Sequence, residues 1–445
     1  FEGGTDLWEQ DLRERKTRLL TKQSGGGEMF LNKAGDNIYM VSNGIKKINT
    51  KTGATTDVKF AADFNYRPAD QRAYIFDHAW QQVKDKFYKT ALHDVDWDFY
   101  RQSYRRFLPS INNNYDFAEL LSEMLGELNA SHTGARYFAP NNAMTTGSLG
   151  AFYDESYTGD GLKVKEVIAR GPFAVRNAEV KPGTIIEAID GEKITAGMDY
   201  FPLLEGKAGK KVRLSIYNPS TGKRSEQTVR AINAGQERAL LYKRWVKRNE
   251  ALVDSLSGGQ LAYVHVQGMN SPRFREVYST LLSEKNRQRK AVIVDTRHNG
   301  GGWLHDDLLT LLTGKEYQQF VPRDQYIGSD PFNKWLKPSC VLVCEDNYSN
   351  ASGFPVIYQS QGAGKVNGAP IPGTMTAVWW ETQIDPSIVF GIPQVGVRDM
   401  KGVYGENTEL QPDILIYNRP EEVEAGIDRQ IEAAVKHLLQ ITAQQ

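Results

Sequence analysis

Two serines, Ser349 and Ser352, lie in the stretch DNYSNASGFP at residues 346–355, directly after the short apolar run CVLVC. A serine in a polar turn between a strand and a helix is well placed to act as a nucleophile. The free N–H groups and the dipole at the start of a helix favour developing negative charge. We expect Pro355 within the first turn of that helix, where proline is tolerated. Local physics alone does not choose between the two serines.

Three consecutive glycines, Gly300–Gly302, end the motif DTRHNGGG at residues 295–302, which follows the apolar run AVIVD. Such a run lets the backbone approach a ligand closely, and its N–H groups can form a nest that binds an anion. The anion could be a phosphate or the oxyanion of a carbonyl group under attack. Because no G-x-x-x-x-G-K-[ST] or G-x-G-x-x-G pattern is present, a nucleotide is the weaker hypothesis. A tightly packed loop without a ligand is a further interpretation.

Histidine, the most common general base, occurs only seven times in the chain. His132 follows Ser131 in a turn directly after a predicted helix, and it is either a general base or a polar loop residue. His298 and His305 flank the glycine run, but no third metal ligand is evident beside them. We therefore predict no metal ion and no other cofactor.

The composition excludes several classes of protein. The 445 residues are too many for one core, and Lys plus Arg equals Asp plus Glu at 54 each. This balance argues against a nucleic-acid-binding protein, which usually has a basic excess. No apolar run approaches the roughly 20 residues that a membrane-spanning helix needs. The chain starts at Phe1, which we interpret as the result of a removed leader or of a fragment.

Only two cysteines are present, Cys340 and Cys344, in one predicted strand. Extended geometry separates their Cα atoms by roughly 13 Å, which is too far for a disulfide. We interpret both as small buried hydrophobic residues, which do not report the redox compartment. Exported and cytoplasmic locations both remain open.

Four domains are predicted along the chain. Residues 1–65 contain alternating apolar patterns (DNIYMVS and IKKINTKTG) that indicate antiparallel hairpins, too few for a stable sheet. Residues 66–137 have helical spacing, and residues 138–235 form a β-rich module with turns at KPG and DG. Residues 236–445 alternate apolar strands with helices, as in a mostly parallel sheet, and end in one amphipathic helix over 421–439. The expected fold class is multidomain, with α+β and α/β parts.

Four motifs occur in an order that resembles the C-terminal half of tricorn-type proteases, in the S41 serine peptidase family. They are ELNASHTG, then VKPGTIIEAIDGEKI, which is similar to a PDZ domain, then VDTRHNGGG with YSNASGFP, and finally GENTELQPD. The resemblance covers about residues 68–440. It implies a helical domain, a PDZ-like domain and an α/β protease core, with residues 1–65 as the end of a preceding β-propeller.

The resemblance also implies catalytic residues, matched one at a time. The S-H pair of the family falls on Ser131 and His132, and the glutamate of E-N-x-x-L-x-P-D falls on Glu406. Alignment on Phe354–Pro355 makes Ser349 the nucleophile. The resemblance thus implies a Ser–Glu–Ser–His tetrad.

Further assignments follow from the same resemblance. The backbone N–H groups of Gly302 and Asn350 would form the oxyanion hole, and Ser352 would be a polar residue at the helix start. A second branch of S41 uses a Ser–Lys dyad, but Thr374 stands at the position of that lysine here. This difference favours the histidine mechanism.

The function implied is that of a serine peptidase that cleaves peptides through an acyl-enzyme. The expected partners are peptide substrates and, because the family tends to assemble, other copies of the chain. An alternative is a PDZ-containing peptide-binding or assembly protein whose catalytic residues are vestigial. The sequence has no motif that predicts the preferred cleavage site.

Overall fold

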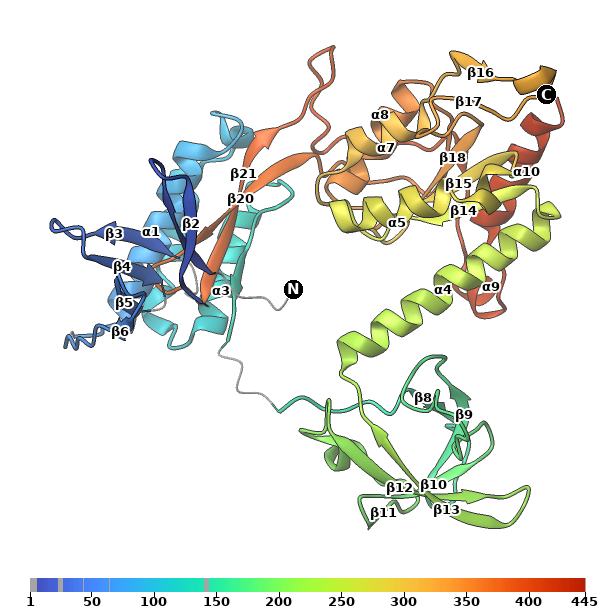
Figure 1. Cartoon of the computed structure of the whole chain (residues 1–445), viewed down its shortest axis with the longest axis horizontal. Helices are drawn as coiled ribbons and strands as arrows, with labels where there is room; N and C mark the ends of the chain where they lie inside the picture. Colours follow the sequence, from blue (N-terminus) through green and yellow to red (C-terminus); the bar gives the residue numbers. More distant parts are fainter. Residues whose placement is uncertain (1–5, 23–26, 43, 64, 140–143, 445) are drawn as a thin grey trace. The chain divides into compact units, whose positions relative to one another are not determined.

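The structure, a computed structural model, describes residues 6–22, 27–42, 44–63, 65–139 and 144–444. Residues 140–143, near one predicted domain boundary, therefore lie outside the described residues, as does Phe1. Two compact units make up the chain, Phe1–Pro68 and Ala69–Gln445 (Figure 1). Of the helices described, none is both long and apolar enough to span a bilayer.

The first unit consists of antiparallel strands. The strands of the two predicted hairpin patterns are β4 (Asn37–Ser42) and β5 (Gly44–Asn49), which pair with each other along their whole length. Leu20, Met40 and Ile48 form a small buried cluster. The strands are a pair, β1 (Leu7–Asp11) and β2 (Lys16–Thr21), and a four-stranded sheet, β3 (Glu28–Leu31), β4 (Asn37–Ser42), β5 (Gly44–Asn49) and β6 (Thr55–Asp57).

The second unit begins with a helical part. Asp96 and Asn113 cap the second and third helices by accepting hydrogen bonds from the backbone N–H groups of Phe99 and Asp116. The helices are α1 (Pro68–Lys86), α2 (Trp97–Arg105) and α3 (Asn114–Gly126), with short 3₁₀ turns at Leu92–Asp94 and Leu108–Ser110.

A three-stranded sheet completes the core of this helical part. It consists of β7 (Ala135–Tyr137), β20 (Thr376–Thr382) and β21 (Ile388–Gly396), in the order β20-β21-β7. Residues Ile388, Phe390 and Ile392 of β21 pack among the buried residues of the helices. The chain segment after α3 is therefore held by strands that lie about 250 residues further along the sequence, and the sequence patterns did not predict this pairing.

The β-rich module has a sheet in the order β13-β12-β10-β9-β8, with β11 paired to β10. The predicted KPG and DG turns place Gly183 and Gly191 at φ values of 90° and 95°, which glycine adopts without strain. The strands are β8 (Ala151–Tyr153), β9 (Leu162–Val167), β10 (Ile185–Ile189), β11 (Glu192–Lys193), β12 (Lys211–Asn218) and β13 (Lys223–Arg230), with a 3₁₀ turn at Phe201–Leu204.

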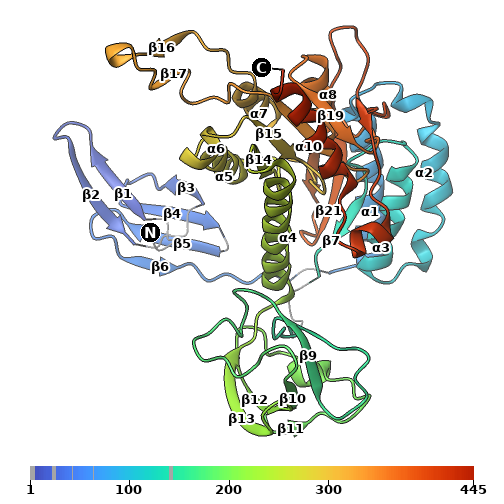
Figure 2. The same ribbon diagram turned by 90° about the vertical axis from the view of Figure 1, so that its right-hand side faces the viewer.

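A long helix, α4 (Ala234–Ser257), follows this module and packs on β14 (Leu261–His265). Figure 2 shows α4 running from the module toward the parallel sheet that contains β14. Its start has a capping box formed by Asn233 and Gln236, and Gly258 ends it in the left-handed conformation. The sequence patterns had not predicted this helix.

A five-stranded sheet is parallel throughout, in the order β14-β15-β18-β19-β22, which confirms the predicted βαβ arrangement. One face packs against α5, α7 and α8, and the other against α4 and α10. The strands are β14 (Leu261–His265), β15 (Ala291–Asp295), β18 (Ser339–Val343), β19 (Lys365–Gly368) and β22 (Ile414–Leu415). The helices are α5 (Ser271–Leu281), α6 (Glu284–Arg287), α7 (His305–Leu312), α8 (Asn350–Ser360), α9 (Pro420–Glu424) and α10 (Arg429–Thr442). A short pair, β16 (Gln318–Phe320) and β17 (Gly328–Asp330), and a 3₁₀ turn at Pro322–Asp324 lie outside this sheet.

The single C-terminal helix predicted over residues 421–439 is wrong. The structure has two helices there, because Gly426 takes a φ of 83° and Asp428 begins α10 as its N-cap. Val423, which was assigned to the buried stripe, lies on α9 and is exposed.

Gly391 of β21 lies directly against the turn after α3. A Cβ atom at this position would stand 2.3 Å from the carbonyl oxygen of His132, and it would also meet the Trp380 ring. We expect Gly391→Ala to destabilise the protein by about 1–3 kcal/mol, as overpacking typically does. Gly126→Ala is the matched control, because a Cβ there meets nothing within 4 Å. Thermal unfolding would contradict the packing argument if both variants had the same midpoint.

Candidate active site

Ser349 lies at the N-cap of α8, on the turn that follows β18. Its backbone has φ 56° and ψ −126°, which is a strained conformation for a residue with a side chain. The backbone N–H of Ser349 donates a hydrogen bond to Thr374 Oγ1 at 2.8 Å, which helps to hold this geometry. Ser349 therefore stands just before the first residue of α8 and is not part of the helix itself.

Ser352 is in a different environment, inside the first turn of α8 and buried. Its hydroxyl donates to the carbonyl oxygen of Pro372 at 2.9 Å. The expectation that Pro355 lies in the first turn of the helix is wrong, because it is the sixth residue of α8. Proline has no N–H for the carbonyl of Ala351, and that carbonyl accepts a hydrogen bond from Asn347 Nδ2 at 3.2 Å instead.

His132 lies between α3 and β7, with a φ of 64° and only 9% of its surface exposed. Its Nδ1 atom is 2.8 Å from Ser131 Oγ and 3.0 Å from Thr376 Oγ1. Its backbone N–H donates to the Tyr348 hydroxyl at 2.7 Å, and the two rings pack with their centroids 4.8 Å apart. Burial lowers the pKa of His132 to about 4, so the imidazole is neutral at pH 7.

Glu406 is buried behind Ser131 and accepts two hydrogen bonds from it. The Ser131 hydroxyl donates to Oε2 at 2.9 Å, and the Ser131 backbone N–H donates to Oε1. Burial raises the pKa of Glu406, while these two hydrogen bonds oppose the rise. Because Ser131 donates to both oxygen atoms, the Glu406 carboxylate acts as the acceptor of this pair.

The contact with Ser131 favours one tautomer of His132. A serine hydroxyl has a single proton, and in Ser131 the carboxylate of Glu406 takes that proton as a hydrogen bond. Ser131 Oγ can then only accept from His132, which favours the tautomer that carries the imidazole proton on Nδ1. Nε2 keeps a free lone pair, which is the form that a general base needs.

The glycine run lies against the turn that contains Ser349. A Cβ on Gly301 would stand 2.6 Å from the Cβ of Ser349, and one on Gly302 would stand 2.0 Å from the carbonyl oxygen of Met269. Glycine is therefore required at both positions. Within the described parts of the chain, the backbone N–H groups of Gly302 and Asn350 have no hydrogen-bond acceptor. Both are available to an incoming oxygen atom.

The side chain of Asn350 ties the glycine run to the serine turn. Its Oδ1 accepts hydrogen bonds from the backbone N–H groups of Leu304 and His305 at 2.8 and 3.0 Å, at the start of α7. The sequence had predicted a role for the backbone of Asn350 only. The capping role could not be found from the sequence, because α7 has no capping side chain of its own at Leu304.

One cavity of about 500 Å³ brings together four of the predicted residues: His132, Gly302, Ser349 and Asn350. Ser131 and Glu406 lie behind His132 and do not line it. In the described structure no hydrogen bond joins Ser349 to His132, and such contacts are often long before a substrate binds. The remaining wall is largely apolar, with the Arg136 guanidinium 4.0 Å above the Trp380 ring.

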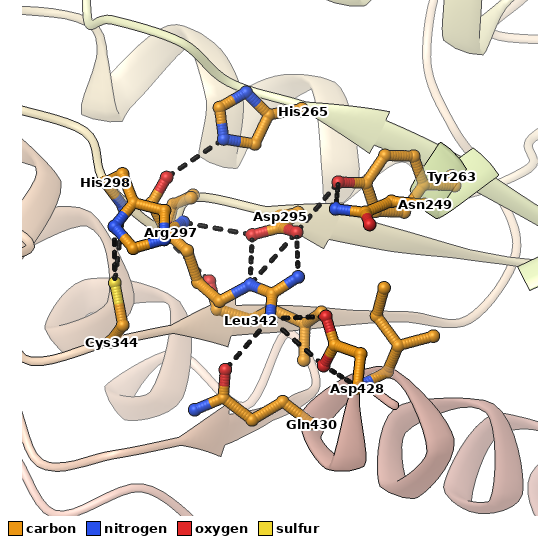
Figure 3. Close-up of polar contacts among 12 residues, drawn as sticks. Asn249, Tyr263, His265, Asp295, Arg297, His298, Leu342, Cys344, Asp428 and Gln430 are labelled. Atoms are coloured by element: carbon orange, nitrogen blue, oxygen red, sulfur yellow. Dashed lines mark hydrogen bonds and ion pairs between the residues drawn. The ribbon is translucent and has the colours of Figure 1, made fainter. Parts of the chain in front are cut away.

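A buried ion network supports the loop that leads to the glycine run (Figure 3). Arg297 is 3% exposed, and its guanidinium binds Asp295 at 2.7 Å and Asp428 at 2.9 Å. Burial alone would raise the pKa of Asp295, but Arg297 holds it below its ordinary value. Gln430 also accepts a hydrogen bond from Arg297 at 3.0 Å, so the network joins the end of β15 to the start of α10.

Comparison with known families gives three matches along the second unit. The model of the Tricorn protease C1 domain matches residues 68–126, and that of the Tricorn protease PDZ domain matches residues 155–234. The model of Peptidase family S41 matches residues 260–416. These matches include the segment that contains Gly302, Ser349 and Glu406.

Similar curated proteins bear tricorn names. "Tricorn protease homolog 1" of Streptomyces coelicolor is 28% identical over 83% of this chain and 35% of its own length. "Tricorn protease" of Thermoplasma acidophilum is 25% identical over 82% of this chain and 34% of its own length. The chain thus spans about a third of the length of these relatives. A solved structure, "Crystal structure of the tricorn protease", shares the fold over 98% of this chain and 43% of its own, with a TM-score of 0.86 at 21% identity.

Burial of His132 has a consequence for titration. The folded imidazole stays neutral down to about pH 4, whereas an unfolded one takes up a proton near 6.5. The lowered pKa therefore contributes stability above pH 6.5, and this contribution is lost as the pH falls toward 4. We expect the His132 ring resonance, assigned by its absence in His132→Gln, to titrate near pH 4 in NMR spectra. Titration near 6.5 would show that the ring is not buried in solution.

Proposed function

Because this chain belongs to the tricorn-type branch of peptidase family S41, we propose that it hydrolyses peptides through an acyl-enzyme on Ser349. The observation that supports this most strongly is the series Glu406–Ser131–His132, which ends beside Ser349 in one cavity. The substrates are peptides, and the apolar wall of the cavity receives their side chains.

In the proposed reaction, Ser349 Oγ attacks the carbonyl carbon of the peptide bond. His132 Nε2 takes the serine proton and later gives it to the leaving amine. Glu406 stabilises the imidazolium ion through Ser131, since a carboxylate accepts from the serine while the serine accepts from Nδ1–H. Ser131 and Glu406 are positioning residues in this scheme.

The oxyanion of the tetrahedral intermediate is bound by the N–H groups of Gly302 and Asn350. Both are free of protein acceptors in the described residues and line the same cavity as Ser349. Donors held in place before the reaction are worth about 3 kcal/mol each in such sites. The Asn350 side chain, which binds the start of α7, keeps the two donors at a constant separation.

The β-rich module, as a tricorn-type PDZ domain, would bind an extended peptide at a sheet edge. We assign residues 1–65 to the end of a β-propeller. The apolar side chains of Met29, Phe30 and Leu31 on strand β3 are largely exposed, as expected for side chains that pack against another blade.

The choice of nucleophile is tested with three variants. Ser349→Ala and His132→Ala should each lower kcat/KM for peptide substrates by about 10⁴-fold or more. Ser352→Ala removes a hydrogen bond outside the cavity and should stay within about tenfold of the wild type. Full activity in Ser349→Ala, with loss in Ser352→Ala, would reverse the assignment. A fluorophosphonate should label the wild type at Ser349, and no labelling would favour a vestigial site in a peptide-binding protein.

The role of Glu406 is tested with Glu406→Gln. The amide is close in size but uncharged, so it no longer stabilises the imidazolium ion, and kcat should fall by about 10²–10⁴-fold with KM little changed. Glu409→Gln, an exposed glutamate three residues later, is the matched control and should leave kcat unchanged. A variant that binds substrate less tightly but turns over normally would contradict a role in catalysis.

A further inference from the structure

The two histidines that flank the glycine run lie in different environments. His305 Nδ1 is 2.7 Å from Asn350 Nδ2, and His305 lines the proposed catalytic cavity. His298 lies outside that cavity, with its Nδ1 atom 2.9 Å from Asp346 Oδ2 and 3.8 Å from Cys344 Sγ. Figure 3 shows His298 beside Cys344, on the far side of Arg297 from α10.

Three potential metal ligands therefore meet at this point. The ligand atoms of His298, Cys344 and Asp346 all lie within 4.8 Å of one another. The fold accounts for their proximity, since β15 and β18 are adjacent parallel strands and the three residues follow their carboxyl ends. The third ligand was not evident from the sequence, because His298 was paired there with His305.

The chemistry of the cluster suits Zn²⁺. Thiolate, imidazole and carboxylate are the ligands that zinc prefers, and three protein ligands with one water complete a tetrahedral site. A thiolate and a carboxylate supply two negative charges, which balance the charge of the ion. Ligand atoms around zinc stand roughly 3.2–3.8 Å apart, from metal–ligand distances of about 2.0–2.3 Å. The pair Nδ1–Sγ already has this separation, and the exposed Asp346 side chain needs only a small outward movement.

The surrounding structure holds the first two ligands in place. Cys344 is 5% exposed, its backbone N–H donates to Asn347 Oδ1 at 3.1 Å, and the His298 backbone N–H donates to Cys344 Sγ at 3.2 Å. His298 directly follows Arg297, whose ion pairs fix the backbone there. The His298 and Asp346 side chains are 61% exposed, so the ion and its water ligand can enter from solvent.

We propose that His298 Nδ1, Cys344 Sγ and an oxygen of Asp346 bind a Zn²⁺ ion, with water as the fourth ligand. Without metal, the Cys344 thiol donates to Asp346 Oδ1 at 2.7 Å, and burial together with Asp346 raises the pKa of that thiol to about 12. Zinc binding releases the thiol proton to solvent and replaces this hydrogen bond with two metal–ligand bonds.

The ion would join two loops that meet again at the proposed catalytic cavity. One loop continues from His298 to Gly302, and the other from Cys344 to Ser349. The site does not depend on peptidase activity, because none of its ligands lines that cavity. Zinc binding and peptide hydrolysis can therefore be tested separately.

The test is zinc binding to chelator-treated full-length protein, measured by isothermal titration with Zn²⁺. We expect one ion per chain, and a Co²⁺-substituted protein should show a thiolate-to-metal charge-transfer band. Cys344→Ser, His298→Asn and Asp346→Asn should each weaken zinc binding by more than about 100-fold, beyond the roughly 10–100-fold effect of residues outside the ligand shell. His298 and Asp346 are exposed, so their variants keep the test valid even if Cys344→Ser fails to fold.

Two control variants show whether zinc binding is specific to this cluster. Cys340→Ala removes the other buried cysteine, which lies in β18 away from the cluster, and it should bind zinc like the wild type. His132→Ala removes the proposed catalytic base and should also keep the ion. Absence of binding at micromolar Zn²⁺, unchanged affinity in the three ligand variants, or loss of the ion in His132→Ala would each overturn the proposal.

Discussion

A buried guanidinium is the constraint on which the α/β part of the structure depends. Arg297 lies out of water between Asp295 and Asp428, and the desolvation of three charged groups is repaid only when all of them are present in good geometry. Removal of one partner from such a network typically costs about 3–5 kcal/mol. Asp295 is the last residue of β15, and Asp428 is the N-cap of α10. The ion pairs of Arg297 therefore hold the end of the strand, the loop after it and the start of the helix together. Gly300–Gly302 follow Arg297 by three to five residues. The ion pairs of Arg297 therefore fix the backbone just before a segment that is flexible by its sequence.

A second constraint acts from the other side of the proposed catalytic cavity. His132 is positioned largely by long-range contacts: β7 pairs with β21, Glu406 binds Ser131, and Tyr348 accepts from the His132 backbone. The helical part and the parallel sheet thus share one polar cluster. The polar groups of Glu406, Ser131, His132 and Thr376 hydrogen-bond to one another. A buried polar network favours one defined structure only when its groups have such partners.

Patterns within short stretches of sequence predicted the strands and turns that depend on neighbouring residues. The apolar runs LAYVHV, AVIVD and CVLVC became adjacent parallel strands, and the DG and KPG turns formed where glycine was needed. The break before α10 was missed although Gly426 and Asp428 signal it, because the apolar stripe continued across them. Pro355 was placed too early, since nothing in the sequence near it reveals that Asn347 compensates the lost hydrogen bond.

The candidate site was predictable only in part, for a related reason. Its residue types and their order resembled a known family, and this resemblance selected Ser349, His132 and Glu406. The contacts that position them come from Thr374, Thr376, the Tyr348 hydroxyl and the Asn350 side chain, and the motifs do not reveal what these side chains contact. Such contacts depend on pairings between distant segments, and these pairings follow from the whole fold. The proximity of the three candidate metal ligands was not predicted, because they follow two strands whose adjacency was not yet known.

The separation of these partners in the sequence has a consequence during synthesis. Glu406 is translated 275 residues after Ser131, and β21 comes nearly as late. Until both have emerged from the ribosome, His132 has neither its strand partner nor its carboxylate, although the segment around it has long been made. Under the proposed mechanism, a nascent chain therefore lacks an assembled catalytic site while these segments are missing. The order of translation thus places completion of the proposed catalytic site near the end of synthesis.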